Sequence, residues 1–118
     1  MITTSTPTVF LFSYGTLRDK KIQIATFGRE LTGRMESLPG YVKRMVQIAD
    51  PKLAALIGES HNANLEPSSG PDDAVCGTLF EITEQELAAA DRYETITGYR
   101  RISVVLKAGH LAWVYVQA

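Results

Sequence analysis

Apolar side chains recur along the chain in short runs that predict several strands. Residues 9–12 form a continuous apolar run, which is typical of a strand covered on both faces. Residues 111–116 offer apolar side chains to both faces of a strand, and residues 101–106 precede them across a turn that contains Gly109. The first and the last predicted strands are therefore both expected to need cover on each face.

The middle of the chain predicts two further strands and a long loop. Residues 34–38 and 41–48 flank Pro39-Gly40, so we expect two strands joined at this turn. Residues 53–57 are apolar without a clear period, which leaves their structure open. Residues 58–73 are rich in Asn, Ser, Pro, Gly and Asp, and they predict an exposed loop that is long enough to be a candidate lid.

Two helices are predicted, and one of them has a well-marked start. After a strand over residues 74–82, Thr83-Glu84-Gln85-Glu86 is a capping-box pattern, in which the first and last residues satisfy each other's backbone donors. The helix that follows is expected to end near Tyr93 or Glu94. Residues 20–27 carry apolar side chains at helical spacing and predict a shorter helix.

Together these elements indicate an α+β fold. Several short strands with only two helices fit a small, closed or nearly closed mixed β-barrel with the helices packed outside it. The chain has 118 residues, of which 45% are hydrophobic and 21% charged, and this is the profile of one domain with a single core. We therefore expect one domain over residues 1–118, with the Thr-, Ser- and Pro-rich residues 1–7 flexible.

Charge and cysteine content narrow the classes of partner and compartment. The net charge is −1 and the charged residues of both signs are interleaved, so we expect neither a nucleic-acid partner nor a membrane partner. The longest apolar stretch is far shorter than the ~20 residues that cross a bilayer. The lone Cys76 forms no disulfide within the chain, and the N-terminal residues lack the pattern of a signal peptide. A cytoplasmic location is the resulting expectation.

Glu94 is the most informative anomaly in the hydrophobic pattern. At 3.6 residues per turn it shares a helix face with Leu87 and Ala90, the face expected to meet the core. Burial without a cationic partner would raise the pKa of this carboxyl toward the range useful for proton transfer near neutral pH. In the alternative interpretation the helix ends at Tyr93, and Glu94 points into solvent or pairs with Arg100 or Arg101.

A second candidate site is the segment Tyr14-Gly15-Thr16-Leu17, which follows the first predicted strand. Glycine allows the backbone to approach a ligand closely, and successive N–H groups in such a turn can receive a carboxylate or an oxyanion. The segment lacks the further glycines and the Lys-Ser/Thr pair of a phosphate-binding loop. A plain turn is the alternative interpretation of the same four residues.

The remaining reactive residue types carry weaker signals. Cys76 lies in an apolar strand and is interpreted as a buried small hydrophobe, since no base is indicated beside it. His61 and His110 have no metal-ligand spacing, so no metal is expected. The aromatic residues near element ends fit either a pocket lining or the core: Tyr93, Tyr99, Trp113 and Tyr115.

Three segments in order resemble the gamma-glutamylcyclotransferase superfamily, in particular its short avirulence-induced-protein-like branch. Residues 12–17 match the Tyr-Gly-(Thr/Ser)-(Leu/Asn) signature of that family. Residues 76–82, followed by residues 87–94, are similar to its Gly-X-Leu/Val strand and to the helix that carries its catalytic glutamate. Residues 98–101 and 112–115 resemble the Tyr-Arg and Val-Tyr strands that follow.

The resemblance implies a small β-barrel enzyme that converts a small gamma-glutamyl compound into 5-oxoproline and a released amine, without a cofactor. It implies Glu94 as the acid/base, and the residues Tyr14 to Leu17 as the loop that holds the glutamyl group, with Tyr99 and Tyr115 as further substrate-binding candidates. Two departures stand beside the site. Thr95 replaces a common glycine, and Arg18-Asp19-Lys20-Lys21 replaces a glycine-containing segment. A binding module on the same barrel, without turnover, is the alternative, and the oligomeric state stays open.

Overall fold

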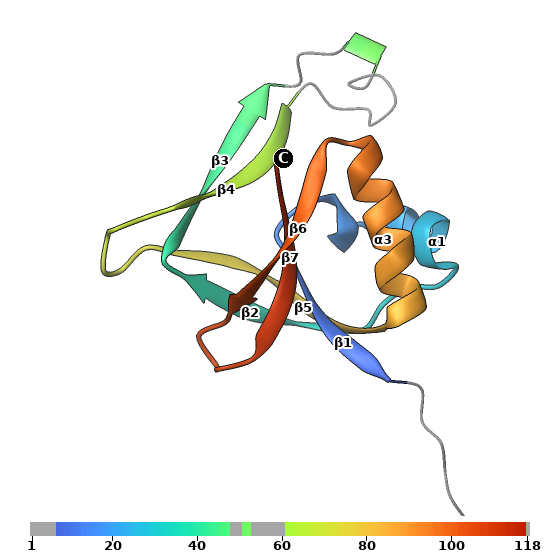
Figure 1. Cartoon of the computed structure of the whole chain (residues 1–118), viewed down its shortest axis with the longest axis horizontal. Helices are drawn as coiled ribbons and strands as arrows, with labels where there is room; N and C mark the ends of the chain where they lie inside the picture. The colour runs from blue at the N-terminus through green and yellow to red at the C-terminus, as the bar shows by residue number, and fades with distance from the viewer. Residues whose placement is uncertain (1–6, 48–50, 53–60, 118) are drawn as a thin grey trace, which may run out of the picture.

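Seven strands and two α-helices make up the part of the chain that the computed structural model describes, residues 7–47, 51–52 and 61–117 (Figure 1). The strands are β1 (Thr8–Ser13), β2 (Gly33–Pro39), β3 (Tyr41–Gln47), β4 (His61–Pro67), β5 (Ala74–Thr83), β6 (Tyr99–Val105) and β7 (Leu111–Gln117). The helices are α1 (Lys20–Phe27), α3 (Glu84–Ile96) and a short 3₁₀ turn, η1 (Thr16–Arg18). The α+β class is confirmed.

β1 lies at the centre of a five-stranded sheet with the order β2-β5-β1-β7-β6. It pairs antiparallel with β5 and parallel with β7, where Leu11 is opposite Trp113. Side chains of β1 alternate between two hydrophobic clusters, with Leu11 in one and Phe12 in the other. Val114 and Tyr115 of β7 are divided between the two clusters in the same way, so the expectation that both faces of the first and last strands are covered is confirmed.

The two clusters lie on opposite faces of the five-stranded sheet. One fills the interior between this sheet and the β3–β4 pair, and its buried members are Phe12, Tyr14, Leu38, Ala63, Leu65, Val75, Leu79, Val104, Leu106, Ala112, Val114 and Val116. The other lies between the sheet and the helices, and its buried members are Leu11, Leu17, Leu31, Phe80, Ile82, Leu87, Ala90, Tyr99 and Tyr115. α1 and α3 pack side by side over this second face (Figure 1).

The barrel is not closed by strand pairing within the described residues. β3 and β4 form a separate two-stranded sheet, so the closed form of the predicted barrel is wrong, and the nearly closed form describes the fold. Two contacts draw the parts together. The N–H of Lys107 donates to the carbonyl of Ser37 at 2.9 Å, and the N–H of Gln117 donates to Oδ1 of Asn64 at 3.0 Å. The curled sheet and the strand pair thus enclose one interior.

Two predictions about the middle of the chain are corrected. The strands on either side of Pro39-Gly40 do not pair with each other, because β2 pairs with β5 and β3 pairs with β4. Gly40, with φ of 84°, makes the turn that carries the chain from one sheet to the other. The predicted loop over residues 58–73 contains β4, so it is not a lid of irregular structure. Its polar composition is explained by a two-stranded edge that faces solvent on one side. Residues 53–60 lie outside the described residues.

The ends of the helices follow local capping chemistry. Thr83 and Glu86 form the predicted capping box, since Oγ1 of Thr83 accepts the N–H of Glu86 at 3.1 Å and Oε1 of Glu86 accepts the N–H of Thr83 at 2.9 Å. α3 continues to Ile96, two to three residues beyond the predicted end. This extra part-turn decides where Glu94 lies, as shown below.

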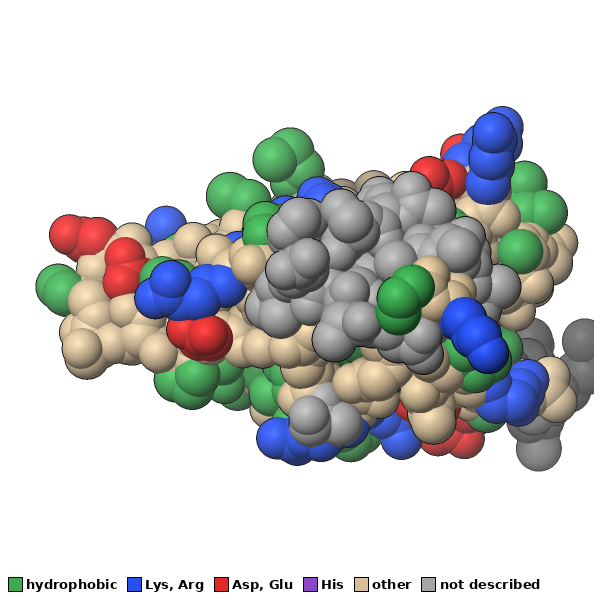
Figure 2. Space-filling model, turned by 90° about the horizontal axis from the view of Figure 1, so that it is seen from above, with side chains coloured by type: hydrophobic (Ala, Val, Ile, Leu, Met, Phe, Trp, Pro, Cys, Tyr) green, Lys and Arg blue, Asp and Glu red, His purple; other side chains and the backbone are tan. Residues whose placement is uncertain are grey.

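The surface has a mixed character. On the face shown in Figure 2, basic and acidic side chains lie among polar and apolar ones over the described residues, in keeping with the net charge of −1.

Cys76 is exposed, so the prediction that it is a buried hydrophobe is wrong. The residue alternates with the buried Val75 along β5 and falls on the outer face of the strand.

No helix within the described ranges is both long enough and apolar enough to span a membrane.

β5 passes so close to β1 at Gly77 that a side chain has no room there. A Cβ at this position would lie 2.6 Å from the ring of Phe12 and 2.6 Å from the carbonyl oxygen of Ser13. The Ser13 carbonyl belongs to the backbone of the central strand, so moving it would disturb the pairing with β5, and the Phe12 ring is fully buried in the core. We expect Gly77→Ala to lower the free energy of unfolding by about 1–3 kcal/mol, measured by urea denaturation. Cys76→Ala, on the exposed face of the same strand, is the control and should change it by less than about 0.5 kcal/mol. Equal stability of the two variants would contradict this account of the close approach.

Candidate active site

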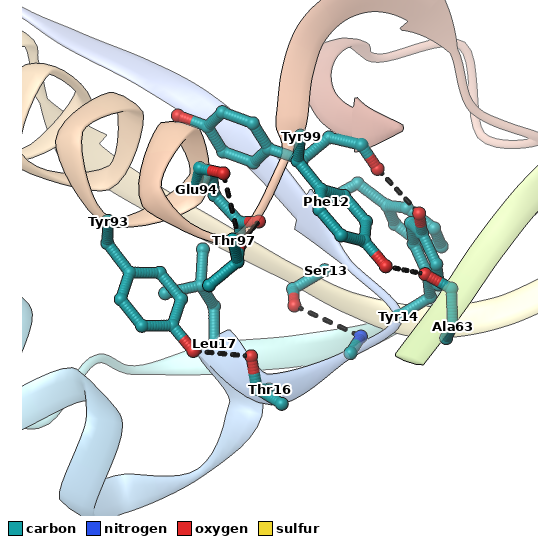
Figure 3. A pocket seen from close by; sticks show the side chains of 12 residues that line it. Phe12, Ser13, Tyr14, Thr16, Leu17, Ala63, Tyr93, Glu94, Thr97 and Tyr99 are labelled. Atoms are coloured by element: carbon teal, nitrogen blue, oxygen red, sulfur yellow. Dashed lines mark hydrogen bonds between the residues drawn. The ribbon is translucent and has the colours of Figure 1, made fainter. Parts of the chain in front are cut away.

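One pocket brings together Glu94, the loop from Tyr14 to Leu17, Tyr99 and Tyr115. It lies where the loop after β1 meets the end of α3, and β4, β6 and β7 complete its walls (Figure 3). Its lining consists of Phe12, Ser13, Tyr14, Gly15, Thr16, Leu17, Ala63, Tyr93, Glu94, Thr97, Tyr99 and Tyr115. The cavity has a volume of about 30 Å³, which is room for about two water molecules at ~10–15 Å³ each.

Glu94 is the acidic residue of this lining. It lies on the same face of α3 as Leu87 and Ala90, and only 8% of its surface is exposed. The alternative interpretation, in which the helix stops at Tyr93 and Glu94 turns to solvent or to an arginine, is wrong. Arg101 instead lies 3.5 Å from Asp91. The helical period thus places the Glu94 carboxyl group on the buried face of α3.

Burial changes the acidity of Glu94. Loss of solvation disfavours the charged form and raises the pKa of Glu94 to about 7, against an ordinary value of 4.5. A hydrogen bond from Thr97 opposes this effect in part, because it stabilises the ionised form. The group can therefore exchange its proton near neutral pH.

Thr97 caps α3 and also reaches the Glu94 side chain. Its Oγ1 donates to the Glu94 carbonyl at 2.9 Å and lies 3.4 Å from Glu94 Oε2 (Figure 3). We expect Thr97→Val, which removes the hydroxyl and keeps the shape, to raise the pKa of Glu94 further. Titration of the Glu94 carboxyl by NMR measures the change. Thr95→Val, exposed at the same end of the helix, is the control and should leave the titration where it is in the wild type. A lower pKa of Glu94 in the Thr97→Val variant would show that the Thr97 hydroxyl favours the neutral form of the carboxyl.

The loop from Tyr14 to Leu17 forms the wall opposite α3. Leu17, 2% exposed, anchors it in the cluster beneath the helices. The hydroxyl groups of Thr16 and Tyr93 lie 2.9 Å apart and form a hydrogen bond that joins the loop to α3 (Figure 3). Within the described part of the chain, no heavy atom other than those of Gly15 and its two chain neighbours lies within 4 Å of where a Cβ of Gly15 would be, so there is space beside this backbone. The loop thus borders the pocket, and its role in binding a ligand stays a prediction.

Three tyrosines of the pocket direct their hydroxyl groups at protein atoms. Tyr14 donates to the carbonyl of Tyr115 at 2.5 Å, and Tyr99 donates to the carbonyl of Ala63. Tyr115 donates to Oδ1 of Asp91 at 2.7 Å. Burial raises the pKa of each phenol above its ordinary range, so all three stay protonated. They hold the walls in place and offer their rings to the cavity.

Some lining residues were not singled out by sequence reasoning. Phe12 and Ser13 belong to the strand predicted before the loop. Thr97 lies beyond the predicted end of the second helix, which the structure extends to Ile96. Ala63 comes from β4, inside the segment that was predicted to be a loop. A strand pattern in residues 61–67 is obscured by Asn and Pro, so no local signal pointed to it. Trp113, one of the aromatic candidates, lies outside this lining, and its ring packs 4.3 Å from the Arg101 guanidinium.

The fold and the pocket together define a class of protein, an α+β domain with a buried glutamate facing a glycine-containing loop. The family model described as gamma-glutamyl cyclotransferase, AIG2-like, matches residues 11–118. The chain therefore belongs to the gamma-glutamyl cyclotransferase, AIG2-like family. A search of the curated proteins found no match.

Several solved structures share the fold. A gamma-glutamyl cyclotransferase is 13% identical with a TM-score of 0.69, and the match covers 95% of this chain and 68% of that one. A protein from Arabidopsis thaliana is 19% identical with a TM-score of 0.67, over 97% of this chain and 71% of that one. A yeast gamma-glutamyl cyclotransferase specific to glutathione is 16% identical with a TM-score of 0.60, over 95% and 69%. At these identities the likeness shows the fold alone.

Proposed function

We propose that this protein is a gamma-glutamyl cyclotransferase, which closes the gamma-glutamyl group of a small amine, amino acid or peptide conjugate to 5-oxoproline and releases the amine. The observation that carries the proposal is the placement of Glu94, buried in the pocket with a pKa raised to about 7 and facing the loop from Tyr14 to Leu17. Membership of the family supports the same reaction. Tyr99 and Tyr115 would line the substrate's chain.

The chemistry consists of one acyl exchange with three proton transfers. The α-ammonium group of the substrate has to lose a proton before its nitrogen lone pair can attack the γ-carbonyl carbon. In the proposed mechanism Glu94, as carboxylate, takes this proton. A bond forms between the α-nitrogen and the carbonyl carbon, and Glu94, now a carboxylic acid, gives its proton to the leaving nitrogen as the bond from that carbon to the leaving nitrogen breaks. The ring nitrogen passes its one remaining extra proton to the released amine, which departs as an ammonium ion, and Glu94 ends in its starting form.

The raised pKa of Glu94 suits both halves of this cycle. A carboxyl with an ordinary pKa would be ionised near neutral pH but would be a poor acid toward a departing nitrogen. With a pKa of about 7, the two protonation states are nearly equal in free energy at neutral pH. The attack is intramolecular, so the pocket contributes mainly by holding the chain in the folded shape that brings amine and carbonyl together.

The backbone N–H groups of the loop would bind negative charge on the substrate. The α-carboxylate and the developing oxyanion are the two candidates, and both are suited to fixed N–H donors in a site with little water. All steps are proton transfers and acyl exchange, so the proposed mechanism needs no cofactor. A cytoplasmic setting, as expected from the lone Cys76, is part of the proposal.

A substrate panel tests the function. The wild-type protein is incubated with gamma-glutamyl amines, amino acids and peptides, glutathione included, and the products are identified by mass spectrometry. We expect 5-oxoproline and one equivalent of free amine from at least one class. Binding without any product would instead identify a small-ligand-binding module on the same fold. Transfer of the glutamyl group to a second amine would identify an amide transferase. Either of these results would overturn the proposal.

A further inference from the structure

The carbonyl groups of the loop beside the pocket are all held from one side. Arg18 binds two of them: its Nη2 donates to the carbonyl of Tyr14 at 3.0 Å, and both its Nε and its backbone N–H donate to the carbonyl of Gly15 at 3.2 Å. Arg18 itself is exposed and is not among the residues that line the pocket. Its guanidinium group therefore holds the loop from outside.

The next two carbonyl groups are anchored in the same way. The N–H of Asp19 donates to the carbonyl of Thr16 at 2.9 Å. Nε2 of Gln23 donates to the carbonyl of Leu17 at 2.9 Å. Gln23 is only 3% exposed, and its Oε1 accepts the N–H of Leu31 at 2.8 Å, so its amide is fixed at both ends. Four consecutive carbonyl groups thus have donors outside the pocket.

The geometry of the peptide bond turns this anchoring into a statement about the N–H groups. In a planar trans peptide the carbonyl and the following N–H point in opposite directions. Holding the carbonyls of Tyr14, Gly15 and Thr16 on the outer side therefore turns the following N–H groups the opposite way, and the N–H of Gly15 accordingly donates at 3.4 Å to Oγ of Ser13, a residue of the pocket lining. A peptide flip in this loop would cost one or both hydrogen bonds of Arg18, which are strengthened by its charge.

We propose that Arg18 is a positioning residue, which orients the loop N–H groups for the negatively charged part of the substrate, with Gln23 as the buried second anchor. This inference deepens the proposed function and rests on it. Its chemical basis is the planar guanidinium fork, which binds two carbonyl groups at once in a geometry that a lysine ammonium does not reproduce. The role is therefore one of shape, and charge alone does not fill it.

Two substitutions separate shape from charge. Arg18→Lys keeps the positive charge and loses the fork, and Arg18→Met loses both. Lys20→Met is the matched control, because Lys20 is an exposed cation two residues away whose side chain pairs at 3.7 Å with Glu30. With a substrate found in the panel, we expect kcat/KM to fall by roughly 10- to 100-fold in both Arg18 variants. Lys20→Met should stay within about two-fold of the wild type.

A second measurement reads the loop itself. Backbone amide NMR spectra of the free protein should show shifted resonances for Gly15, Thr16 and Leu17 in both Arg18 variants. The resonances of the far strands and those of the Lys20 variant should match the wild type. A merely electrostatic role for Arg18 would leave the Arg18→Lys protein unchanged in both spectrum and turnover.

Turnover and the amide spectra together distinguish failure of the proposed function from failure of the inference about Arg18. Unchanged loop amides in Arg18→Met would overturn the inference, whatever the activity, and so would shifted amides with kcat/KM within two-fold of the wild type. If the wild type turns over nothing in the panel, the proposed function fails. In that case the amide shifts still decide whether Arg18 positions the loop.

Discussion

Glu94→Gln is expected to lower kcat for 5-oxoproline release by about 10²- to 10⁴-fold, the usual contribution of a general acid/base. Glutamine fills the same space and keeps the side-chain oxygen near Thr97, but it cannot take the proton of the substrate amine. Binding of the reaction product, 5-oxoproline, should persist, because the loop from Tyr14 to Leu17 is untouched. Turnover is measured by mass spectrometry and binding by calorimetry.

Two carboxylates of the same helix serve as controls for this experiment. Glu84 lies exposed in the first turn of α3, and Glu84→Gln should keep wild-type turnover. Asp91 lies about one turn before Glu94 and accepts the hydroxyl of Tyr115, a bond that an asparagine oxygen can also accept. Asp91→Asn should therefore leave the chemistry nearly intact. Wild-type rates in Glu94→Gln, or an equal loss in Asp91→Asn, would move the acid/base role away from Glu94.

The same substitution is expected to make the protein more resistant to unfolding at high pH. The pKa of Glu94 is about 7 in the folded protein and near 4.5 when the side chain is solvated. Below pH ~4.5 the carboxyl is protonated in both states and burial of its charge costs nothing. As the pH rises toward 7, the unfolded chain releases this proton and the folded chain retains it, so the wild type loses stability. Above pH ~7 the loss is complete, at about 1.4 kcal/mol per pKa unit, or about 3 kcal/mol in all.

Urea denaturation of wild type and Glu94→Gln at pH 4 and pH 8 measures this linkage. The difference in unfolding free energy between the two proteins should favour the variant by about 3 kcal/mol more at pH 8 than at pH 4. Other titrating groups are common to both proteins and cancel in the difference. Glu84→Gln, at an exposed position of the same helix, is the control for this comparison. A difference that does not vary with pH would show that burial leaves the acidity of Glu94 unaltered.

These two expectations belong together. A group that is buried at the cost of stability, and that gains acid/base capacity from the same burial, is a common property of catalytic sites. If Glu94→Gln gives a more stable protein with little turnover at pH 8, the loss of activity cannot come from unfolding. The stability measurement is thus also the folding control for the kinetic one.

The candidate site was accessible to sequence reasoning because local signals pointed to Glu94 and to the loop from Tyr14 to Leu17, and the resemblance to a known family chose between the alternatives that those signals left open. The helical period places Glu94 on the face of Leu87 and Ala90, and the capping box at Thr83 sets the start from which that period is counted. The local pattern places the end of the helix only to within a few residues, so it does not determine whether Glu94 is inside the helix. In the structure α3 continues to Ile96, and Glu94 is buried on its inner face.

Pairing of the strands was not accessible in the same way. The two strands around Pro39-Gly40 resemble a hairpin in sequence, yet β2 pairs with β5, far along the chain, and β3 pairs with β4. Alternation along a strand indicates which side chains share a face, but it carries no information about the neighbour that supplies the hydrogen bonds. Ala63 reaches the pocket only because of this pairing.

The sequence by itself determined the α+β class, the main elements, the helix face of Glu94 and the position of the loop from Tyr14 to Leu17, because each follows from periodicity or turn chemistry within a short segment. The tertiary structure alone decided that this loop and Glu94 share one cavity, and that burial raises the pKa of the glutamate to about 7. It also decided that Arg18 and Gln23 hold the loop from outside. These properties depend on which distant groups surround an atom, and desolvation and hydrogen bonding act through space, where the order of residues does not specify them.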